Sequence, residues 1–345
     1  MTRILAPPPV REAEPGQAPT FSVVIAAYQA ADVIGEALDS LRRQTLAPLE
    51  VIVCDDGSTD GLTEALVPYR DEIVLIRKEN GGEASAKNAA AARARGNFIA
   101  ILDADDVYLP TRLASLAELA LARPDLDILT TDAFLVANGV TVRSNYDETW
   151  RFEVADQRRA IVQRNFIFGH AAVRRTGFVE HGGFDESIRW TTDWDLWLRM
   201  ILAGSVAGCV DEPLALYRLR ETSLTAQRRD LLLGKLQTLE KARENPALRP
   251  AELPLLEGAL AAHRRDLSLL DLRTAVAARA PDARRRALKV VLQPEFGGRR
   301  RLEAAVMAFA PAVAGRVFRR RSARSWVGAG GTHVRRDGRG RAVRT

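Results

Sequence analysis

The chain between residues 21 and 136 alternates short apolar runs with longer amphipathic stretches. The apolar runs are rich in β-branched side chains, as buried strands are, and they cover residues 21–27, 50–56, 72–77, 97–106 and 125–136. In the stretches between them, apolar positions share one helical face, as Ile34, Leu38 and Leu41 do. This alternation predicts a doubly wound α/β domain whose mostly parallel sheet is covered on both faces.

The pattern changes after about residue 225, where amphipathic helical stretches are broken by prolines. We therefore expect four parts: a disordered leader over 1–20, the α/β domain over 21–225, a helical extension over 226–297, and a basic amphipathic helix with a disordered tail over 298–345. The leader lacks the apolar core of a signal peptide, and no apolar run reaches the ~18 residues of a spanning helix. Because both cysteines are isolated, no disulfide framework is expected, and a cytoplasmic location fits best.

Charge is distributed unevenly along the chain. The net charge is +6, but residues 298–345 hold 13 Arg against two acidic residues, a net charge of +11 that leaves −5 for residues 1–297. An acidic globular part with a basic tail predicts an anionic partner for the tail and argues against a nucleic-acid-binding core. Around residues 299–321, two structures stay open: an interfacial helix on an anionic membrane, or a helix packed on the domain before a disordered tail.

Carboxylates gather at the ends of two predicted strands. Asp55 and Asp56 end the second strand, and Asp103 and Asp105 end the fourth. Since ligands of such sheets bind beyond the carboxyl ends of the strands, the four carboxylates predict a site on one rim. The Asp-x-Asp spacing suits a hard divalent cation, Mg²⁺ or Mn²⁺, whose remaining ligands come from a diphosphate.

Two further positions could bind an anion or accept a proton. Two glycines precede the helix that holds Lys87, where backbone N–H groups and the ammonium could contact phosphate, although a solvated lysine fits equally well. Asp193 begins a helix, either as an N-cap or as a general base aimed into a cleft. Neither a P-loop nor a GxGxxG motif is present, which weakens kinase, GTPase and NAD-dependent dehydrogenase interpretations.

Six segments occur in the order and spacing of family 2 glycosyltransferases: FSVVIAAYQAADVIGEALDSLRRQT, VIVCDDGSTDG, ENGGEASAKNAA, FIAILDADD, GGFDESI and TDWDLWLR. Residues 21–225 therefore resemble this family. The resemblance implies a GT-A fold, in which a nucleotide-binding half is joined to an acceptor-binding half. It also implies inverting transfer of a sugar from a nucleotide diphosphate to a hydroxyl, in the synthesis of a polysaccharide, a cell-wall polymer or a glycolipid.

The resemblance assigns roles to residues by position. It implies that Asp193 is the catalytic base, that Asp105 contacts the metal directly, and that Asp103 lies beside the metal and the ribose. The expected nucleotide-binding residues are Ala26, Tyr28, Asp55, Asp56, Lys87, Asp103 and Arg220. The expected acceptor-binding residues are Gly182, Gly183 and Trp190.

The chain departs from the family pattern at three positions. Ala26 stands where Pro is usual, Thr192 where a Glu commonly precedes the base, and Arg220 where His is common in a YRxHxxS stretch. An Arg favours direct contact with a diphosphate over metal ligation. No QxxRW motif follows Asp193, so we expect one or a few transfers per acceptor.

Two other functions are weighed against a glycosyltransferase that lies in the cytoplasm or peripherally on the inner membrane face. A nucleotidyltransferase would need a Gly-rich loop with a basic residue after the first strand, which AAYQAAD does not supply. A non-catalytic nucleotide-sugar-binding or scaffold protein would explain Thr192 and Arg220, but not the retained Asp103, Asp105 and Asp193. The expected partners are a UDP- or dTDP-sugar, a glycan or glycolipid acceptor, and an anionic membrane at the basic tail; nucleic acid is not expected.

Overall fold

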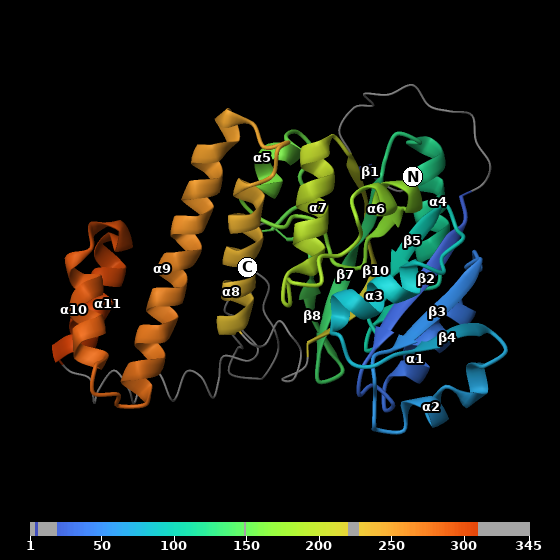
Figure 1. Cartoon of the computed structure of the whole chain (residues 1–345), viewed down its shortest axis with the longest axis horizontal. Helices are drawn as coiled ribbons and strands as arrows, with labels where there is room; N and C mark the ends of the chain where they lie inside the picture. The colour runs from blue at the N-terminus through green and yellow to red at the C-terminus, as the bar shows by residue number, and fades with distance from the viewer. Residues whose placement is uncertain (1–3, 6–18, 148–149, 220–227, 310–345) are drawn as a thin grey trace, which may run out of the picture. The chain divides into compact units, whose positions relative to one another are not determined.

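A computed structural model describes residues 4–5, 19–147, 150–219 and 228–309 (Figure 1). The chain divides into two compact units between Ala261 and Ala262. This division falls inside the predicted extension over 226–297. Most of the predicted leader, and the predicted tail after residue 309, lie outside the described residues.

The first unit is built on one mixed sheet. Its strands are β1 (Ile4–Leu5), β2 (Phe21–Ala27), β3 (Glu50–Asp55), β4 (Ile73–Arg77), β5 (Phe98–Ile101), β6 (Val107–Tyr108), β7 (Ile128–Ala137), β8 (Val140–Ser144), β9 (Ala172–Arg174) and β10 (Ala207–Leu219). The order is β1-β10-β7-β9-β5-β2-β3-β4, with β6 paired to β10 and β8 to β7. The parallel sheet predicted from the first four strands is confirmed in β4-β3-β2-β5. Strand β9 runs antiparallel to both β5 and β7, which makes the complete sheet mixed.

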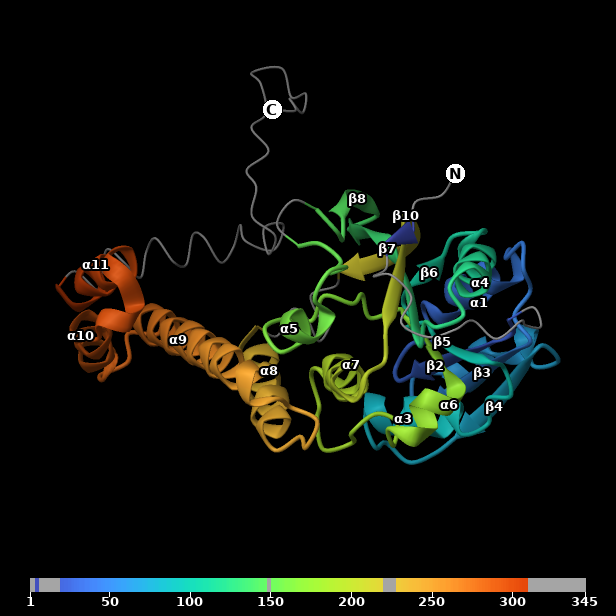
Figure 2. The same ribbon diagram turned by 90° about the horizontal axis from the view of Figure 1, so that it is seen from above.

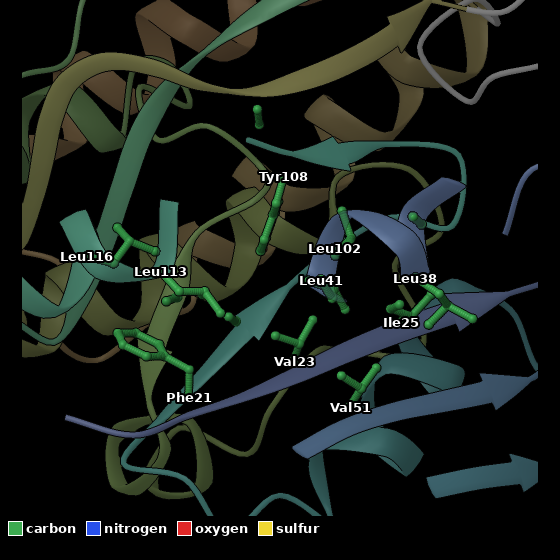
Figure 3. Close-up of a cluster of buried hydrophobic side chains, with 14 of the residues drawn as sticks. Phe21, Val23, Ile25, Leu38, Leu41, Val51, Leu102, Tyr108, Leu113 and Leu116 are labelled. Atoms are coloured by element: carbon green, nitrogen blue, oxygen red, sulfur yellow. The ribbon is translucent and has the colours of Figure 1, made fainter. Parts of the chain in front are cut away.

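Helices cover both faces of the sheet. Those of the first unit are α1 (Ile34–Arg42), α2 (Leu62–Ala65), α3 (Glu83–Ala91), α4 (Arg112–Ala122), α5 (Gln157–Ile161), α6 (Arg175–Glu180), α7 (Thr192–Ala203) and α8 (Arg228–Arg243), with 3₁₀ turns η1 (Val67–Tyr69) and η3 (Pro250–Glu252). Figure 2 shows α1 and α4 on one face and α3 and α6 on the other. The core between β2, α1 and α4 holds Val23, Leu38 and Leu116 (Figure 3). Burial of this apolar surface holds the strand ends, and hence the rim, in place.

The second unit contains α10 (Ala283–Leu292), η4 (Pro294–Phe296) and α11 (Gly297–Phe309), and α9 (Leu253–Ala277) ends in it. Its small core includes Leu272, Ala287, Val290 and Met307. The described part of the predicted basic amphipathic helix is therefore a packed helix. Among the described residues, no helix combines the length and apolar character needed to cross a membrane.

A pair of substitutions in α4 tests the packing of the core. Leu116 is fully buried and Leu121 is 53% exposed on the same helix. We expect Leu116→Ala to lower the free energy of unfolding by about 2–5 kcal/mol, because it leaves a cavity, and Leu121→Ala to change it by less than about 0.5 kcal/mol. Urea unfolding measures both, and equal losses would contradict the assigned packing.

Candidate active site

Strand β5 ends in an acidic turn over residues 103–106. The Asp106 N–H donates to the Asp103 carbonyl at 3.1 Å and closes the turn. Asp106 is buried, and its carboxylate accepts the Arg218 N–H at 2.7 Å. Asp103 and Asp105 are only half-buried. The third carboxylate therefore ties the turn to β10, while the first two stay partly accessible at the carboxyl end of β5.

Lys87 on α3 is a buried cation beside this turn rather than a solvated surface residue. Its Nζ lies 2.9 Å from Oδ1 of Asp103 and also contacts the Glu83 carboxylate, one helical turn earlier. Burial opposes the charge of Lys87, but Asp103 and Glu83 outweigh burial and raise its pKa. Burial also opposes the charge of Asp103, yet Lys87 and His170 hold the pKa of Asp103 well below its ordinary range. The predicted phosphate-binding lysine and a predicted metal ligand thus form an ion pair.

His170, which precedes β9, is a second buried cation in this cluster. Its Nε2 lies 2.7 Å from Oδ2 of Asp106 and 3.5 Å from Oδ2 of Asp103. Burial lowers the pKa of His170, but Asp106 and Asp103 outweigh burial and raise it to about 9. Its carbonyl accepts a hydrogen bond from the buried Arg112 guanidinium. No sequence motif surrounds His170, so its role could not be predicted, and the contact exists only because β9 is inserted beside β5.

The cluster of Asp103, Asp106 and His170 fits a divalent metal. Each residue offers one ligand atom, and these atoms lie within 4.8 Å of one another. The buried Oδ2 of Asp106 and Nε2 of His170 approach each other without the alignment of a hydrogen bond. Two carboxylates with an imidazole form a donor set that suits Mn²⁺ and similar ions. This cluster shares Asp103 with the predicted pair of ligands, whereas Asp105 is not part of it.

The carboxylate of Asp56 is engaged by the protein itself. It accepts the N–H groups of Gly81 and Gly82 at 2.9 and 2.8 Å, and Lys78 Nζ lies 2.8 Å away. The two glycine N–H groups that were predicted to contact a bound anion therefore donate to a carboxylate of the chain itself. Asp56 thus fixes the entry to α3, the helix that carries Lys87.

The other predicted nucleotide-binding positions lie where β2 and β3 end. The buried carboxylate of Asp55 accepts the Ser58 N–H at 2.8 Å, and Arg77 Nε lies 3.4 Å from it. Ala26 is half-buried, and the Tyr28 side chain is 54% exposed. Because β2 and β3 are parallel and adjacent, the structure brings these positions to one edge of the sheet.

Asp193, the predicted base, lies in the first turn of α7. The N-cap is Thr191, so Asp193 does not hold the capping position that was its alternative interpretation. Its Oδ2 accepts a hydrogen bond from Asn165 Nδ2 at 2.9 Å, and a Cβ added at Gly169 would lie 3.6 Å from it. Burial raises the pKa of Asp193, and the charge of Lys87 partly opposes this. The residues just before β9 therefore lie between the predicted base and the acidic turn.

A glycine turn lies between α6 and α7. Gly182 and Gly183 have φ of 73° and 68°, a backbone conformation that only glycine adopts readily. The Asn88 side chain accepts the Phe184 N–H and donates to the Phe184 carbonyl, each at 2.9 Å. Arg199 on α7 donates to the Gly183 carbonyl at 2.7 Å. The predicted acceptor-binding turn is thus fixed by both α3 and α7.

Trp190 follows that turn and is half-buried. The Arg189 guanidinium lies 5.3 Å from the centre of its ring. Helix α8 passes so close that a Cβ added at Gly234 would lie 2.6 Å from the Trp190 Cβ. The segment before the predicted base is therefore held by α8 as well.

The end of β10 carries Arg218, which the sequence motifs did not single out, and Arg220 follows the strand. Arg218 donates its N–H to Asp106, and its guanidinium donates to the Asp105 carbonyl at 3.0 Å. The sequence did contain a signal for Arg218, because this residue is the Arg of the stretch that resembles YRxHxxS. Arg220 lies outside the described residues.

Known glycosyltransferases resemble this chain in sequence. Residues 22–182 match the model of a family described as Glycosyl transferase family 2. Over these residues the predicted resemblance to family 2 glycosyltransferases is confirmed. An uncharacterised glycosyltransferase of Rickettsia prowazekii is 29% identical over 54% of this chain and 60% of its own length. The putative teichuronic acid biosynthesis glycosyltransferase TuaG of Bacillus subtilis is 28% identical over 61% of this chain and 83% of its own.

Solved structures share the fold. S. aureus TarS 1–349 in complex with UDP-GlcNAc has a TM-score of 0.59 and 18% identity, covering 87% of this chain and 92% of that one. The mannosyltransferase PcManGT of Pyrobaculum calidifontis, in complex with GDP-Man and Mn²⁺, has a TM-score of 0.57 and 23% identity, covering 90% and 89%. The predicted GT-A fold is confirmed. The chain spans 60% of the length of the first two curated relatives.

Replacing His170 tests the charge balance of the acidic turn. Because the folded-state pKa is raised to about 9 from an ordinary value of about 6.5, protonated His170 stabilises the fold fully below about pH 6.5. This stabilisation is lost as the pH rises through about 9. We expect the free energy of unfolding to fall by up to about 3 kcal/mol over this range, and His170→Asn to flatten the fall.

Urea unfolding at a series of pH values measures this difference. His181→Asn, which removes an imidazole outside the cluster, is the matched control. The same pH slope in His170→Asn and in the unaltered protein would contradict the assignment of His170 as a buried cation.

Proposed function

We propose that the chain is an inverting glycosyltransferase that moves a sugar from a nucleoside diphosphate to a hydroxyl. The observation that carries this proposal concerns the residues just before β9. Asn165 and Gly169 lie beside Asp193, and His170 lies beside the acidic turn of β5. The match of residues 22–182 to the model of glycosyl transferase family 2 supports it. A base and a diphosphate-binding turn on one rim are what a single displacement at the anomeric carbon needs.

Asp193 takes the proton of the acceptor hydroxyl in this mechanism. The hydroxyl oxygen then bonds to the anomeric carbon as the bond from that carbon to the diphosphate oxygen breaks, and the nucleoside diphosphate leaves with the bonding pair. Burial raises the pKa of Asp193, which strengthens it as a base, and Asn165 orients the carboxylate. Lys87 lies beside Asp103, where an ammonium suits a phosphate oxygen.

A divalent metal, Mg²⁺ or Mn²⁺, would be held by Asp103, with Asp105 as the predicted second ligand or with Asp106 and a neutral His170. When bound, it would supply positive charge to the departing diphosphate. PcManGT supports this choice, since it was solved with GDP-Man and Mn²⁺. For the nucleotide we propose UDP or dTDP, with Ala26, Tyr28, Asp55 and Asp56 at its base and ribose. TarS was solved with UDP and with UDP-GlcNAc, which supports UDP.

Gly182, Gly183 and Trp190 lie in the segment that leads to the predicted base, and we propose that they contact a glycan or glycolipid acceptor. TuaG is described as a putative teichuronic acid biosynthesis glycosyltransferase, which supports a surface polysaccharide or cell-wall product. We further propose a cytoplasmic protein that is peripheral on the inner membrane face, with the basic tail as one contact.

A non-catalytic nucleotide-sugar-binding or scaffold protein is the alternative function. Thr192, in the place of the common Glu, is the observation that favours it. Both functions predict nucleotide binding, but only the first predicts turnover that depends on Asp193. The two experiments below separate them.

Thermal unfolding with UDP, dTDP or GDP, each with and without Mn²⁺, tests the donor site. A nucleotide at ~100 times its Kd adds about 2.7 kcal/mol to the free energy of unfolding and so raises the melting temperature. We expect a rise that needs Mn²⁺ and is lost in Asp105→Ala. Asp71→Ala, which removes an exposed carboxylate, is the control. No rise with any nucleotide in folded protein would count against a donor site.

Replacing the base tests the chemistry. Asp193→Asn cannot accept the proton, so we expect kcat to fall by about 10²–10⁴-fold while the nucleotide-induced rise in melting temperature persists. In the unaltered protein, kcat should fall as the pH drops through the pKa of Asp193, which burial raises. Release of nucleoside diphosphate in the presence of acceptor measures the rate. Equal kcat in both proteins would exclude Asp193 as the base.

A further inference from the structure

The second unit exposes an unusual amount of apolar surface on α10 and α11. Among the described residues, the three most exposed large apolar side chains all belong to these helices: Leu292 at 78%, Phe309 at 71% and Leu302 at 68%. Leu288 and Val306 are exposed as well. Large apolar side chains that gather on a surface mark an interaction site, whereas scattered ones do not.

The exposed side chains form one continuous face. Leu302, Val306 and Phe309 are spaced by four and three residues, so they share one side of α11, and Leu288 and Leu292 share one side of α10. The opposite sides of both helices pack into the core of the second unit.

Two contacts join the helix faces. Arg301 at the start of α11 donates to the Val291 carbonyl at 2.7 Å near the end of α10. At the other end of the pair, the Arg284 guanidinium lies 5.9 Å from the centre of the Phe309 ring. Arg284 lies one helical turn before Leu288 on α10, so the exposed apolar side of α10 adjoins the exposed apolar side of α11.

Positive charge surrounds this face. The exposed basic side chains around it are Arg284, Arg285, Lys289, Arg299 and Arg301. Within the described part of the chain no carboxylate pairs with these five, although three neighbouring arginines pair with Glu303, Asp282 and Asp266. Residues 279–309 carry a net charge of +5. A partner must therefore be anionic and must also accept apolar side chains.

We propose that the α10–α11 face docks on a bilayer that contains anionic lipid. Leu288, Leu292, Leu302, Val306 and Phe309 enter the boundary between head groups and acyl chains, and the basic side chains contact the head groups. A nucleic acid would satisfy the charge but offers no apolar region for the five side chains. Residues 310–345 carry a net charge of +9, so they are repelled by the same face, as is a second copy of it.

This inference goes beyond the proposed sugar transfer, because it needs only α10 and α11. It also gives the proposed peripheral location a defined surface in place of the tail alone. The nucleotide-induced rise in melting temperature reports on the first unit, so failure of the donor site and failure of the docking face give different results.

Flotation of the full-length protein with vesicles tests the proposal. We expect binding to vesicles of phosphatidylglycerol and phosphatidylcholine, and weak binding to phosphatidylcholine alone. The double variant Leu302→Ser/Phe309→Ser and the double variant Arg284→Glu/Arg285→Glu should each lower the partition constant about tenfold or more. Melting temperature and the response to nucleotide should stay unchanged in both.

Matched controls are available in the first unit. Val140 and Val179 are about as exposed as Leu302, so Val140→Ser/Val179→Ser removes comparable apolar surface. Arg43→Glu/Arg93→Glu makes the same change in net charge at other exposed positions. Neither should change vesicle binding. If the Leu302→Ser/Phe309→Ser protein is unstable, Leu292→Ser alone repeats the test at the most exposed position.

Three results would overturn the proposal. Equal binding to anionic and neutral vesicles would remove the role of charge. Unchanged binding in the Leu302→Ser/Phe309→Ser protein would assign binding to the tail, since the tail is intact in that variant. Binding of duplex DNA that depends on Arg284 and Arg285, with vesicle binding unaffected by any of these variants, would make nucleic acid the partner.

Discussion

Three aspartates within four positions at the end of β5 repel one another, and the surrounding structure is arranged to offset that repulsion. His170 approaches Asp106 and Asp103, Lys87 pairs with Asp103, and the Arg218 backbone donates to Asp106. These partners come from α3, from the segment before β9 and from β10. Removal of one cation would leave a buried carboxylate uncompensated, which is costlier than the loss of one surface ion pair. The acidic turn therefore determines how three separate segments must meet.

The order of strands explains how those segments reach one rim. Strand β9 enters between β5 and β7 in the antiparallel direction, so the residue that precedes it arrives at the edge where the parallel strand β5 ends. His170 and Gly169 consequently lie beside the acidic turn and beside Asp193. An all-parallel sheet would bring the carboxyl end of that strand to the rim instead. The antiparallel insertion thus places His170 beside the acidic turn and Gly169 beside the predicted base.

The sequence predicted the parallel strands, their helices and the carboxylates at their ends, because local periodicity and turn residues determine these features. It could not predict the antiparallel β9, a three-residue strand that pairs only after the chain has folded. His170 was missed for the same reason, since its partners are more than sixty positions away. Asp56 shows another limit: the glycines before α3 suggested an anion site, but their N–H groups are taken by a carboxylate from a different loop. The exposure of apolar side chains on α10 and α11 likewise could not be predicted, because it depends on which face of each helix packs into the small core of the second unit.

The close approach of Gly234 to Trp190 has a consequence for how such a protein can diversify. Any other residue at position 234 places a Cβ within 2.6 Å of the Trp190 Cβ, so α8 would have to move away from the segment that leads to Asp193. A substitution at position 234 therefore requires a compensating shift of α8. Gly234 acts as an evolutionary constraint that couples the position of α8 to the segment that leads to Asp193.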